Sequence, residues 1–241
     1  MASIEQTRPI ARPAREQLNL GAKLRALIQE RYLPLGLLLL AAVLLVSSIA
    51  LPYWNLMLHA PQYPKGLPVT VYVTHLSGQV KEVDGLNHYI GMMKLNEAAR
   101  FERAVAPFAI PVVALLVVAS FWAPGRWKWL LVLPALIFPL VFIGDLAIWL
   151  YYAGHHLDKH AALSSAIKPF TPHVFGVGRI GQFSTEASFG IGFYFIVLGA
   201  LLATAATVIE RRGLRRARPA AREQGELVAT VSERGGSHGP R

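Results

Sequence analysis

Long apolar runs alternate with polar segments along this chain. Four such runs cover residues 33–51, 104–122, 129–152 and 188–209, and Asp145 is the one charged residue that they contain. Each run is 19 to 24 residues long, and a helix needs about 20 residues to cross the roughly 30 Å hydrocarbon layer of a bilayer. The pattern predicts four transmembrane helices within one membrane domain over residues 33–209.

Two long polar segments, 53–103 and 153–187, connect these runs. Residues 69–75 alternate between β-branched apolar and other side chains, which is typical of a strand. A Ser-Gly turn follows, and residues 80–83 are expected to form the return strand. The predicted fold is an all-α membrane protein, a bundle of four transmembrane helices with a small extracytoplasmic cap made of this β-hairpin and loops.

Both ends of the chain are polar and basic. Residues 1–32 form a basic N-terminal segment, in which residues 15–32 repeat leucine at helical spacing. That spacing predicts either an amphipathic helix on the membrane surface or a solvated helical extension. The length of the basic segment favours an uncleaved anchor over a signal peptide. Residues 210–241 are expected to be a disordered basic tail.

The net charge of +10 is distributed unevenly. Residues 1–32, the link 123–128 and the tail 210–241 hold 16 of the 24 basic residues. Basic residues concentrate on the cytoplasmic side of membrane proteins. We therefore expect a bacterial cytoplasmic membrane protein with both termini in the cytoplasm and both long loops outside. The charge then reflects orientation and contact with membrane lipids, and not binding to nucleic acid.

Two kinds of cofactor site are excluded by the sequence. The chain contains no cysteine, which rules out covalent c-type haem attachment and thiolate copper centres. Residues 176–181 match the dinucleotide fingerprint G-x-G-x-x-G. That motif requires a βαβ unit and an acidic residue about 20 positions later, and neither is predicted here. No nucleotide is expected as a partner.

Histidine and methionine concentrate in the two long loops. These loops contain seven of the eight histidines and all three methionines after the initiator. Imidazole and thioether are the ligands that copper prefers when thiolate is lacking. Copper is the expected cofactor, and the predicted metal site consists of His88, Met92, His155, His156, Asp158 and His160. Asp158 is expected to hydrogen-bond to a ligand and not to bind the metal itself.

The proposed pairing of these ligands rests on helical spacing. His88 and Met92 are four residues apart, as are His156 and His160, while His155 and Asp158 are three apart. Other interpretations remain open, because histidines are also stable at a headgroup boundary and methionines often fill apolar gaps.

Asp145 lies within an apolar run, where a carboxylate costs about 2.5–3.5 kcal/mol on insertion scales. Trp149, Tyr152 and His156 follow at spacings of 4, 3 and 4 and share its helix face. Two interpretations remain open. The stripe could carry protons or ions, or Asp145 could serve only to fix the packing of the helices.

Several strings of this chain resemble a known group of proteins: LPYW…APQYPKGLPVTVYV, DGLNHYIGM and GHHLD…KPFTP…GQF. They are similar to those of small multi-pass bacterial membrane proteins found near genes for maturation of the copper enzyme nitrous oxide reductase. The resemblance covers about residues 33 to 209. It implies an accessory role in copper handling or in a respiratory complex, with a protein partner in the membrane.

The expected function is that of an accessory or assembly protein that binds copper transiently on its outer face and serves a respiratory copper enzyme. Enzymatic turnover is not expected. Two alternatives remain open: an ion- or proton-conducting permease subunit that uses Asp145, and a subunit of a membrane copper oxidase or monooxygenase.

Overall fold

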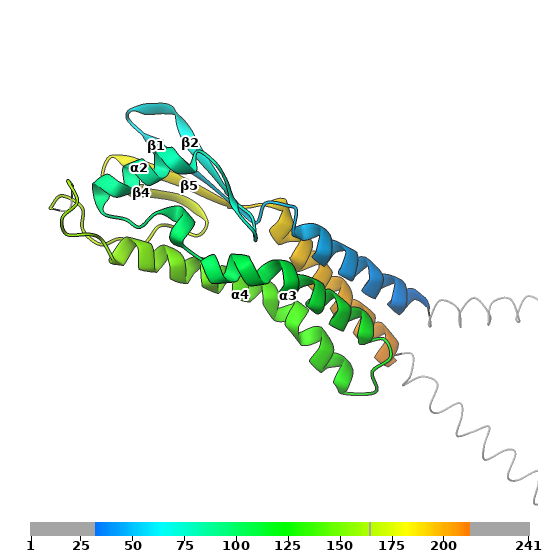
Figure 1. Cartoon of the computed structure of the whole chain (residues 1–241). Coiled ribbons are helices and arrows are strands. Elements are labelled where there is room, and N and C mark those ends of the chain that lie inside the picture. Colours follow the sequence, from blue (N-terminus) through cyan, green and yellow to red (C-terminus); the bar gives the residue numbers. More distant parts are fainter. Residues whose placement is uncertain (1–31, 164, 213–241) are drawn as a thin grey trace, which may run out of the picture. The chain divides into compact units, whose positions relative to one another are not determined.

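The computed structural model describes residues 32–163 and 165–212 (Figure 1). The predicted amphipathic helix and most of the predicted basic tail lie outside these residues. The chain divides into two compact units, one made of residues 1–36 with 208–241 and one made of residues 37–207. The second unit contains the sheet and most of each long helix.

All four apolar runs are helical. Three of these helices are long and apolar enough to cross a membrane: α3 (Arg100–Ala119), α4 (Trp127–His155) and the helix Ile191–Arg212. The remaining run forms the shorter apolar helix Tyr32–Ser48. The structure thus shows three candidate membrane spans and a small antiparallel sheet, and the fourth span remains a prediction.

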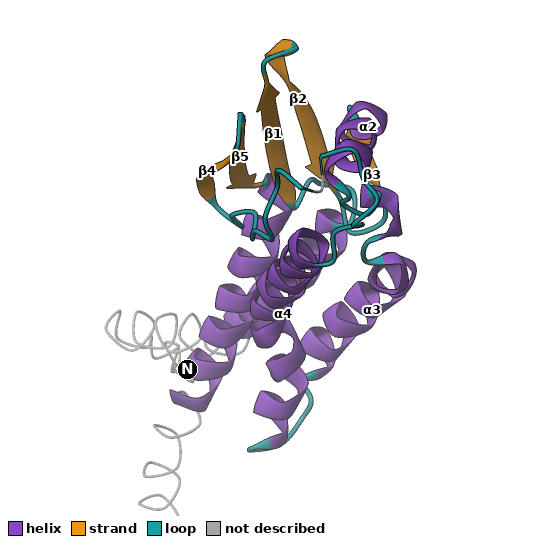
Figure 2. Cartoon of the chain, turned by 90° about the vertical axis from the view of Figure 1, so that its left-hand side faces the viewer, coloured by secondary structure: helices purple, strands orange, loops and turns teal. Residues whose placement is uncertain are grey.

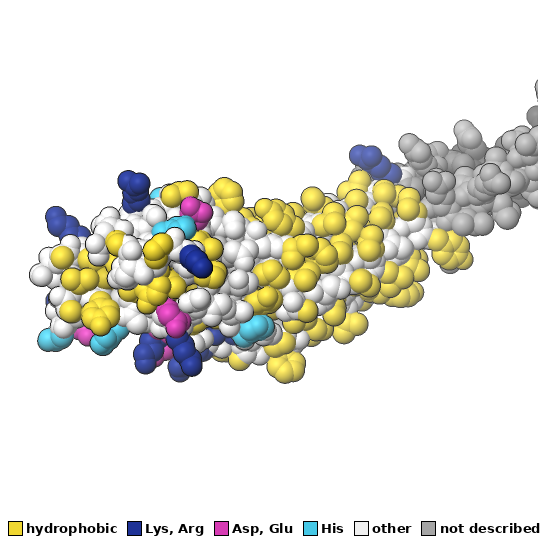
Figure 3. Space-filling view, turned by 90° about the horizontal axis from the view of Figure 1, so that it is seen from above, with side chains coloured by type: hydrophobic (Ala, Val, Ile, Leu, Met, Phe, Trp, Pro, Cys, Tyr) yellow, Lys and Arg dark blue, Asp and Glu magenta, His cyan; other side chains and the backbone are white. Residues whose placement is uncertain are grey.

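Small side chains let the helices pack closely. Ala41, Ala114, Ala135 and Ala203 are buried in one apolar cluster together with larger aliphatic residues. Close approach at small residues is the usual mode of helix association in membranes. Large apolar side chains instead cover the outer surface of the helices (Figure 3), as expected for a surface that contacts lipid.

The cap is a five-stranded antiparallel sheet and not a single hairpin (Figure 2). The first loop contributes β1 (Trp54–Ala60), β2 (Tyr63–Val71) and β3 (Leu76–Gly78), and the second contributes β4 (Gly176–Ile180) and β5 (Phe183–Phe189). The strand order is β3-β2-β1-β5-β4. The two loops therefore meet along the β1–β5 pair, in which Trp54 faces Phe189 and Met57 faces Glu186.

The expected return strand over residues 80–83 is wrong. These residues begin the helix α2 (Val80–Ile90), which buries Val80, Val83, Asn87 and Ile90. Spacings of three and four put these side chains on one helix face, and Val80 and Val83 pack against Leu67 and Val69 of the sheet. A short 3₁₀ helix, η1 (Leu95–Glu97), leads from α2 toward α3.

Candidate functional site

The two histidine-rich segments lie in direct contact at the end of α2. The backbone N–H of Asp158 donates to the carbonyl of Gly91 at 2.9 Å, and that of Leu163 donates to the carbonyl of Tyr89 at 2.9 Å. Gly91 ends α2 in the left-handed conformation, with φ of 81°. A Cβ at Gly91 would lie 2.7 Å from the Asp158 carbonyl oxygen, so this junction requires glycine.

His155 and His156 lie at the C-terminal end of α4, and each presents one ring nitrogen outward. The Nδ1 atoms lie 2.9 Å and 3.1 Å from the carbonyl oxygens of Tyr151 and Tyr152. A carbonyl only accepts, so Nδ1 carries the proton and donates. The His155 ring also stacks on Tyr151, and the His156 ring stacks on Tyr152; in each pair the ring centroids are 4.0 Å apart. The Nε2 lone pairs are therefore available to a ligand.

The predicted helical pairing of His156 with His160, and of His155 with Asp158, is wrong because α4 ends at His155. In a continued helix the N–H of Asp158 would donate to the carbonyl of Gly154. Here that N–H donates to Gly91, and the carbonyl of Gly154 accepts instead from Phe170 at 3.1 Å. Tertiary hydrogen bonds thus end the helix before His160.

Asp158 and His160 form their own pair in the following loop. Oδ1 of Asp158 accepts from the His160 backbone N–H at 2.9 Å and from its Nδ1 at 3.2 Å. The backbone hydrogen bond first, and then the His160 ring, lower the pKa of Asp158, with smaller effects from the charges of His160 and His88. His160 and His88 are both exposed, and one histidine from each loop therefore acts on the charge of this carboxylate.

Met92 does not join His88. The helix α2 ends at Ile90, so the spacing of four that pairs side chains within a helix does not apply here. Met92 is half-buried and packs in an apolar cluster with Ile90 and Phe183, whereas His88 is exposed and lies edge-on to Tyr89. Over residues 32–163 and 165–212, no three His, Asp or Glu side chains converge closely enough to hold a metal ion.

A second site with a histidine, His59 on β1, could not be predicted from the sequence because it depends on the pairing of β1 with β5. Nε2 of His59 lies 3.5 Å from Oε1 of Glu186, and this nitrogen is buried without a hydrogen-bond partner. Met57, two residues before His59 on β1, faces Glu186 across the strands. The alternation in residues 54–60 was the available signal for β1, but its partner strand is 120 or more residues away in sequence.

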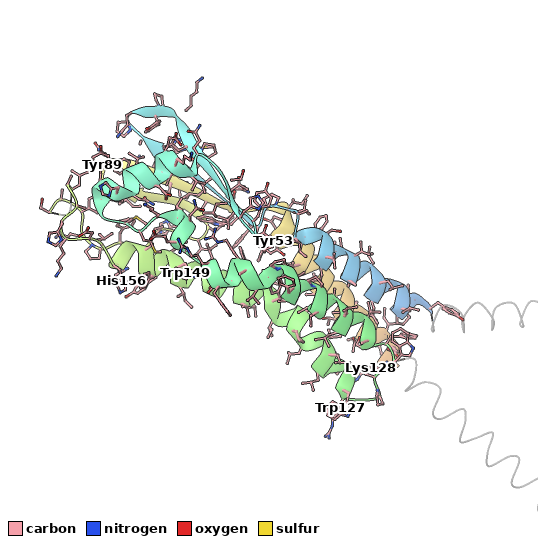
Figure 4. The ribbon with its side chains drawn as sticks, in the orientation of Figure 1. Tyr53, Tyr89, Trp127, Lys128, Trp149 and His156 are labelled. Atoms are coloured by element: carbon pink, nitrogen blue, oxygen red, sulfur yellow. The ribbon has the colours of Figure 1, made fainter. Side chains whose placement is uncertain are left out.

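The Asp145 stripe is a continuous series of contacts along α4. The indole of Trp149 donates a hydrogen bond to the Asp145 carboxyl group. The Trp149 and Tyr152 rings meet edge to face at 6.0 Å, and Tyr152 stacks on His156. Figure 4 shows Trp149 and His156 on the part of α4 that lies beside the sheet. Asp145 also lines an apolar groove together with Glu102 of α3.

Comparisons with protein-family models, with curated proteins and with solved structures gave no match for this chain.

Proposed function

We propose that this chain is an integral membrane protein that binds copper transiently at the outer end of α4 and passes it to a respiratory copper enzyme. The ligands are His155, His156, His160 and His88, with Asp158 as the acceptor that orients His160. Met92, which the sequence predicts as a ligand, packs against Ile90 and Phe183 and is not a ligand in this proposal.

The orientation of the imidazole rings carries the proposal. Nδ1 of His155, His156 and His160 donates to a carbonyl or carboxylate oxygen, which leaves Nε2 unprotonated in the neutral ring. Metal-binding histidines almost always donate their second ring nitrogen in this way, because it fixes the tautomer and the ring direction. Three histidines oriented in this way lie within the six residues 155–160.

Exposure of the ligands supports transient binding. His88, His156 and His160 are exposed, so water competes with them for a bound ion. Copper also accepts few nitrogen ligands in its reduced state, and imidazole suits it when thiolate is lacking. An ion held this way is released readily to a partner with a complete site.

The membrane arrangement in this proposal has four spans with both termini in the cytoplasm. The helix Tyr32–Ser48 contains 17 described residues, which extend about 25 Å at 1.5 Å per residue. This length is at the lower end of the range for a transmembrane helix. The 16 basic residues at the termini and in the link 123–128 support this orientation.

A relay through Asp145 is less well supported by the contacts of the stripe. Trp149, Tyr152 and His156 touch through ring faces and edges, and such contacts provide no chain of hydroxyl and carboxyl groups for a proton. A permanent copper centre of an oxidase requires several converging ligands, and no three His, Asp or Glu side chains of the described residues converge on one point. The geometry therefore favours the accessory role.

The test is a titration of the detergent-purified protein with Cu(I) and Cu(II) against a competing chelator. Replacing His156 and His160 together by Ala is expected to weaken binding by at least about 10- to 100-fold, the effect typical of losing even the outer partners of metal ligands. His75→Ala is the matched control, because His75 is an exposed histidine that stacks on Tyr72 at the sheet. Equal affinities for the wild type and the double variant would show that this site is wrong.

A further inference from the structure

A large apolar groove lies between the sheet and the two helices α3 and α4. Its volume is about 390 Å³, which is within the range of small-molecule sites. The sheet contributes Trp54, Leu56 and Val71, and the helices contribute Ala106, Phe142 and Leu146. The groove is separate from the histidines of the proposed copper site, none of which lines it.

Three charged side chains interrupt this apolar lining: two carboxylates and the guanidinium of Arg103. Glu102, in the first turn of α3, and Asp145 of α4 both line the groove, and their charges interact. One oxygen of Glu102, Oε2, is buried without a hydrogen-bond partner. Two like charges in apolar surroundings are unfavourable, and an unpaired buried polar atom calls for an explanation.

Arg103 also lines the groove, and its charge interacts with that of Glu102, but its hydrogen bonds go to backbone carbonyls. The guanidinium of Arg103 donates to the backbone carbonyls of Asn96 at 2.6 Å, Ala98 at 2.7 Å and Ala99 at 3.3 Å. These bonds hold it at the segment before α3. The two carboxylates therefore present negative charge and hydrogen-bond acceptors to whatever occupies the groove.

The groove lies at the outer end of the candidate spans and carries exposed apolar side chains. Phe101, Val105 and Val141 line it and are 75%, 40% and 55% exposed. Because α3 begins at Arg100, Glu102 is at the outer boundary of this span in the predicted orientation. A membrane lipid can therefore reach the groove from the bilayer with its head group at the level of the carboxylates.

We propose that the groove binds a phospholipid whose head group ends in a primary ammonium. The ammonium lies between Glu102 and Asp145, and an acyl chain lies along the apolar side chains of α3, α4 and the sheet. Charge complementarity selects this occupant, because a cation relieves the repulsion of the two carboxylates. The indole of Trp149 beside Asp145 adds an aromatic face that attracts cations. Arg100 is exposed at the start of α3, close in sequence to Glu102, and suits the lipid phosphate.

The test is native mass spectrometry of the full-length protein in metal-free buffer, with added phosphatidylethanolamine or phosphatidylglycerol of identical acyl chains. The wild type is expected to retain the ethanolamine lipid preferentially. Glu102→Gln with Asp145→Asn keeps the side-chain shapes and is expected to reduce this preference by about tenfold, since two charge-assisted hydrogen bonds are lost. The matched control, Glu82→Gln with Glu97→Gln, removes two exposed carboxylates and leaves the preference unchanged.

A second variant tests the apolar part of the groove. Ala106→Trp fills the space between the helices and is expected to reduce retention of both lipids, and thermal melting of each variant confirms that it is folded. Equal retention of the two lipids by the wild type, or a preference that survives the neutral pair, would overturn the ammonium site. Retention of an added quinol in place of the lipid, or a co-purified protein that covers the groove, would assign it a different occupant. Metal binding plays no part in this experiment, so its outcome is independent of the proposed copper site.

Discussion

At the scale of single residues, the orientation of the His155 and His156 rings decides which of their nitrogen atoms can bind a ligand. Nδ1 of each ring donates to the carbonyl four residues earlier, at the end of α4, so Nε2 is the nitrogen left for a metal ion. This orientation depends on where α4 ends. The sequence therefore shows the concentration of histidine in two loops, and the shared face of Asp145, Trp149, Tyr152 and His156, but not the direction of these rings.

Tyr53 offers a residue-scale prediction about stability. Its side chain is fully buried, and its hydroxyl lies 2.6 Å from Oγ of Ser48. Oγ of Ser48 donates to the carbonyl of Leu45 at 2.6 Å, so Tyr53 is the donor in the shared bond. Tyr53→Phe is expected to lower the free energy of unfolding by about 1–2 kcal/mol, measured by denaturant titration in detergent. Tyr89→Phe, at an exposed position, is the control, and an equal loss there would contradict this role for Tyr53.

The same tyrosine predicts a dependence on pH. Burial raises the pKa of Tyr53 from 10.0 to about 12, and the hydrogen bond with Ser48 opposes this only in part. The folded state therefore holds the phenolic proton more tightly than the unfolded state. This contribution to stability is complete below pH 10 and is lost as the pH rises through about 12. Melting temperatures between pH 9 and 11.5 are expected to fall more steeply for the wild type than for Tyr53→Phe, and parallel curves would refute the assignment.

At the scale of elements, apolar runs predict helices well and strand partners poorly. Each of the four apolar runs forms a helix, and three of these helices are long enough to cross a membrane, because an apolar run of this length has few other ways to satisfy its backbone in a membrane. The hairpin was predicted in the wrong place, since β2 ends at Val71 and residues 80–90 form α2. Both β1 and β5 border apolar runs, and their pairing brings together residues far apart in sequence. Local alternation carries no information about such a partner.

Gly91 gives a prediction at the junction of α2 with the second loop. Gly91→Ala places a Cβ at a positive φ and 2.7 Å from the Asp158 carbonyl oxygen. The loss of stability is expected to be about 1–3 kcal/mol. Because this junction joins the end of the helix that contains His88 to the loop that contains Asp158 and His160, the proposed copper site predicts that copper affinity falls as well.

Gly85→Ala is the matched control for this substitution. Gly85 is within α2, and a Cβ there meets no atom within 4 Å. Alanine in a helix interior is expected to stabilise by about 0.5–1 kcal/mol. Opposite signs for the two glycines in thermal melting would support the junction, and equal small effects would argue against it.

At the scale of the whole molecule, the lengths of α3 and α4 and the charge distribution point to one arrangement. The 29 residues of α4 extend about 44 Å, well beyond the roughly 30 Å hydrocarbon layer. The 20 residues of α3 match that layer. If the link 123–128 is cytoplasmic, the C-terminal part of α4 projects outward beyond the membrane and carries His155 and His156 with it. The position of Glu102 opposite Asp145 then marks the outer boundary.

The absence of cysteine from the sequence makes this arrangement directly testable. Single cysteines are introduced at Ser77 on β3 and at Pro124 in the link before α4, both exposed positions. In intact spheroplasts, a membrane-impermeant maleimide is expected to label Ser77→Cys but not Pro124→Cys, and detergent is expected to make both reactive. The reverse pattern would place the histidines in the cytoplasm, where free copper is kept very scarce. The copper proposal would then fail, whereas the groove between Glu102 and Asp145 would keep its chemistry and face the inner leaflet.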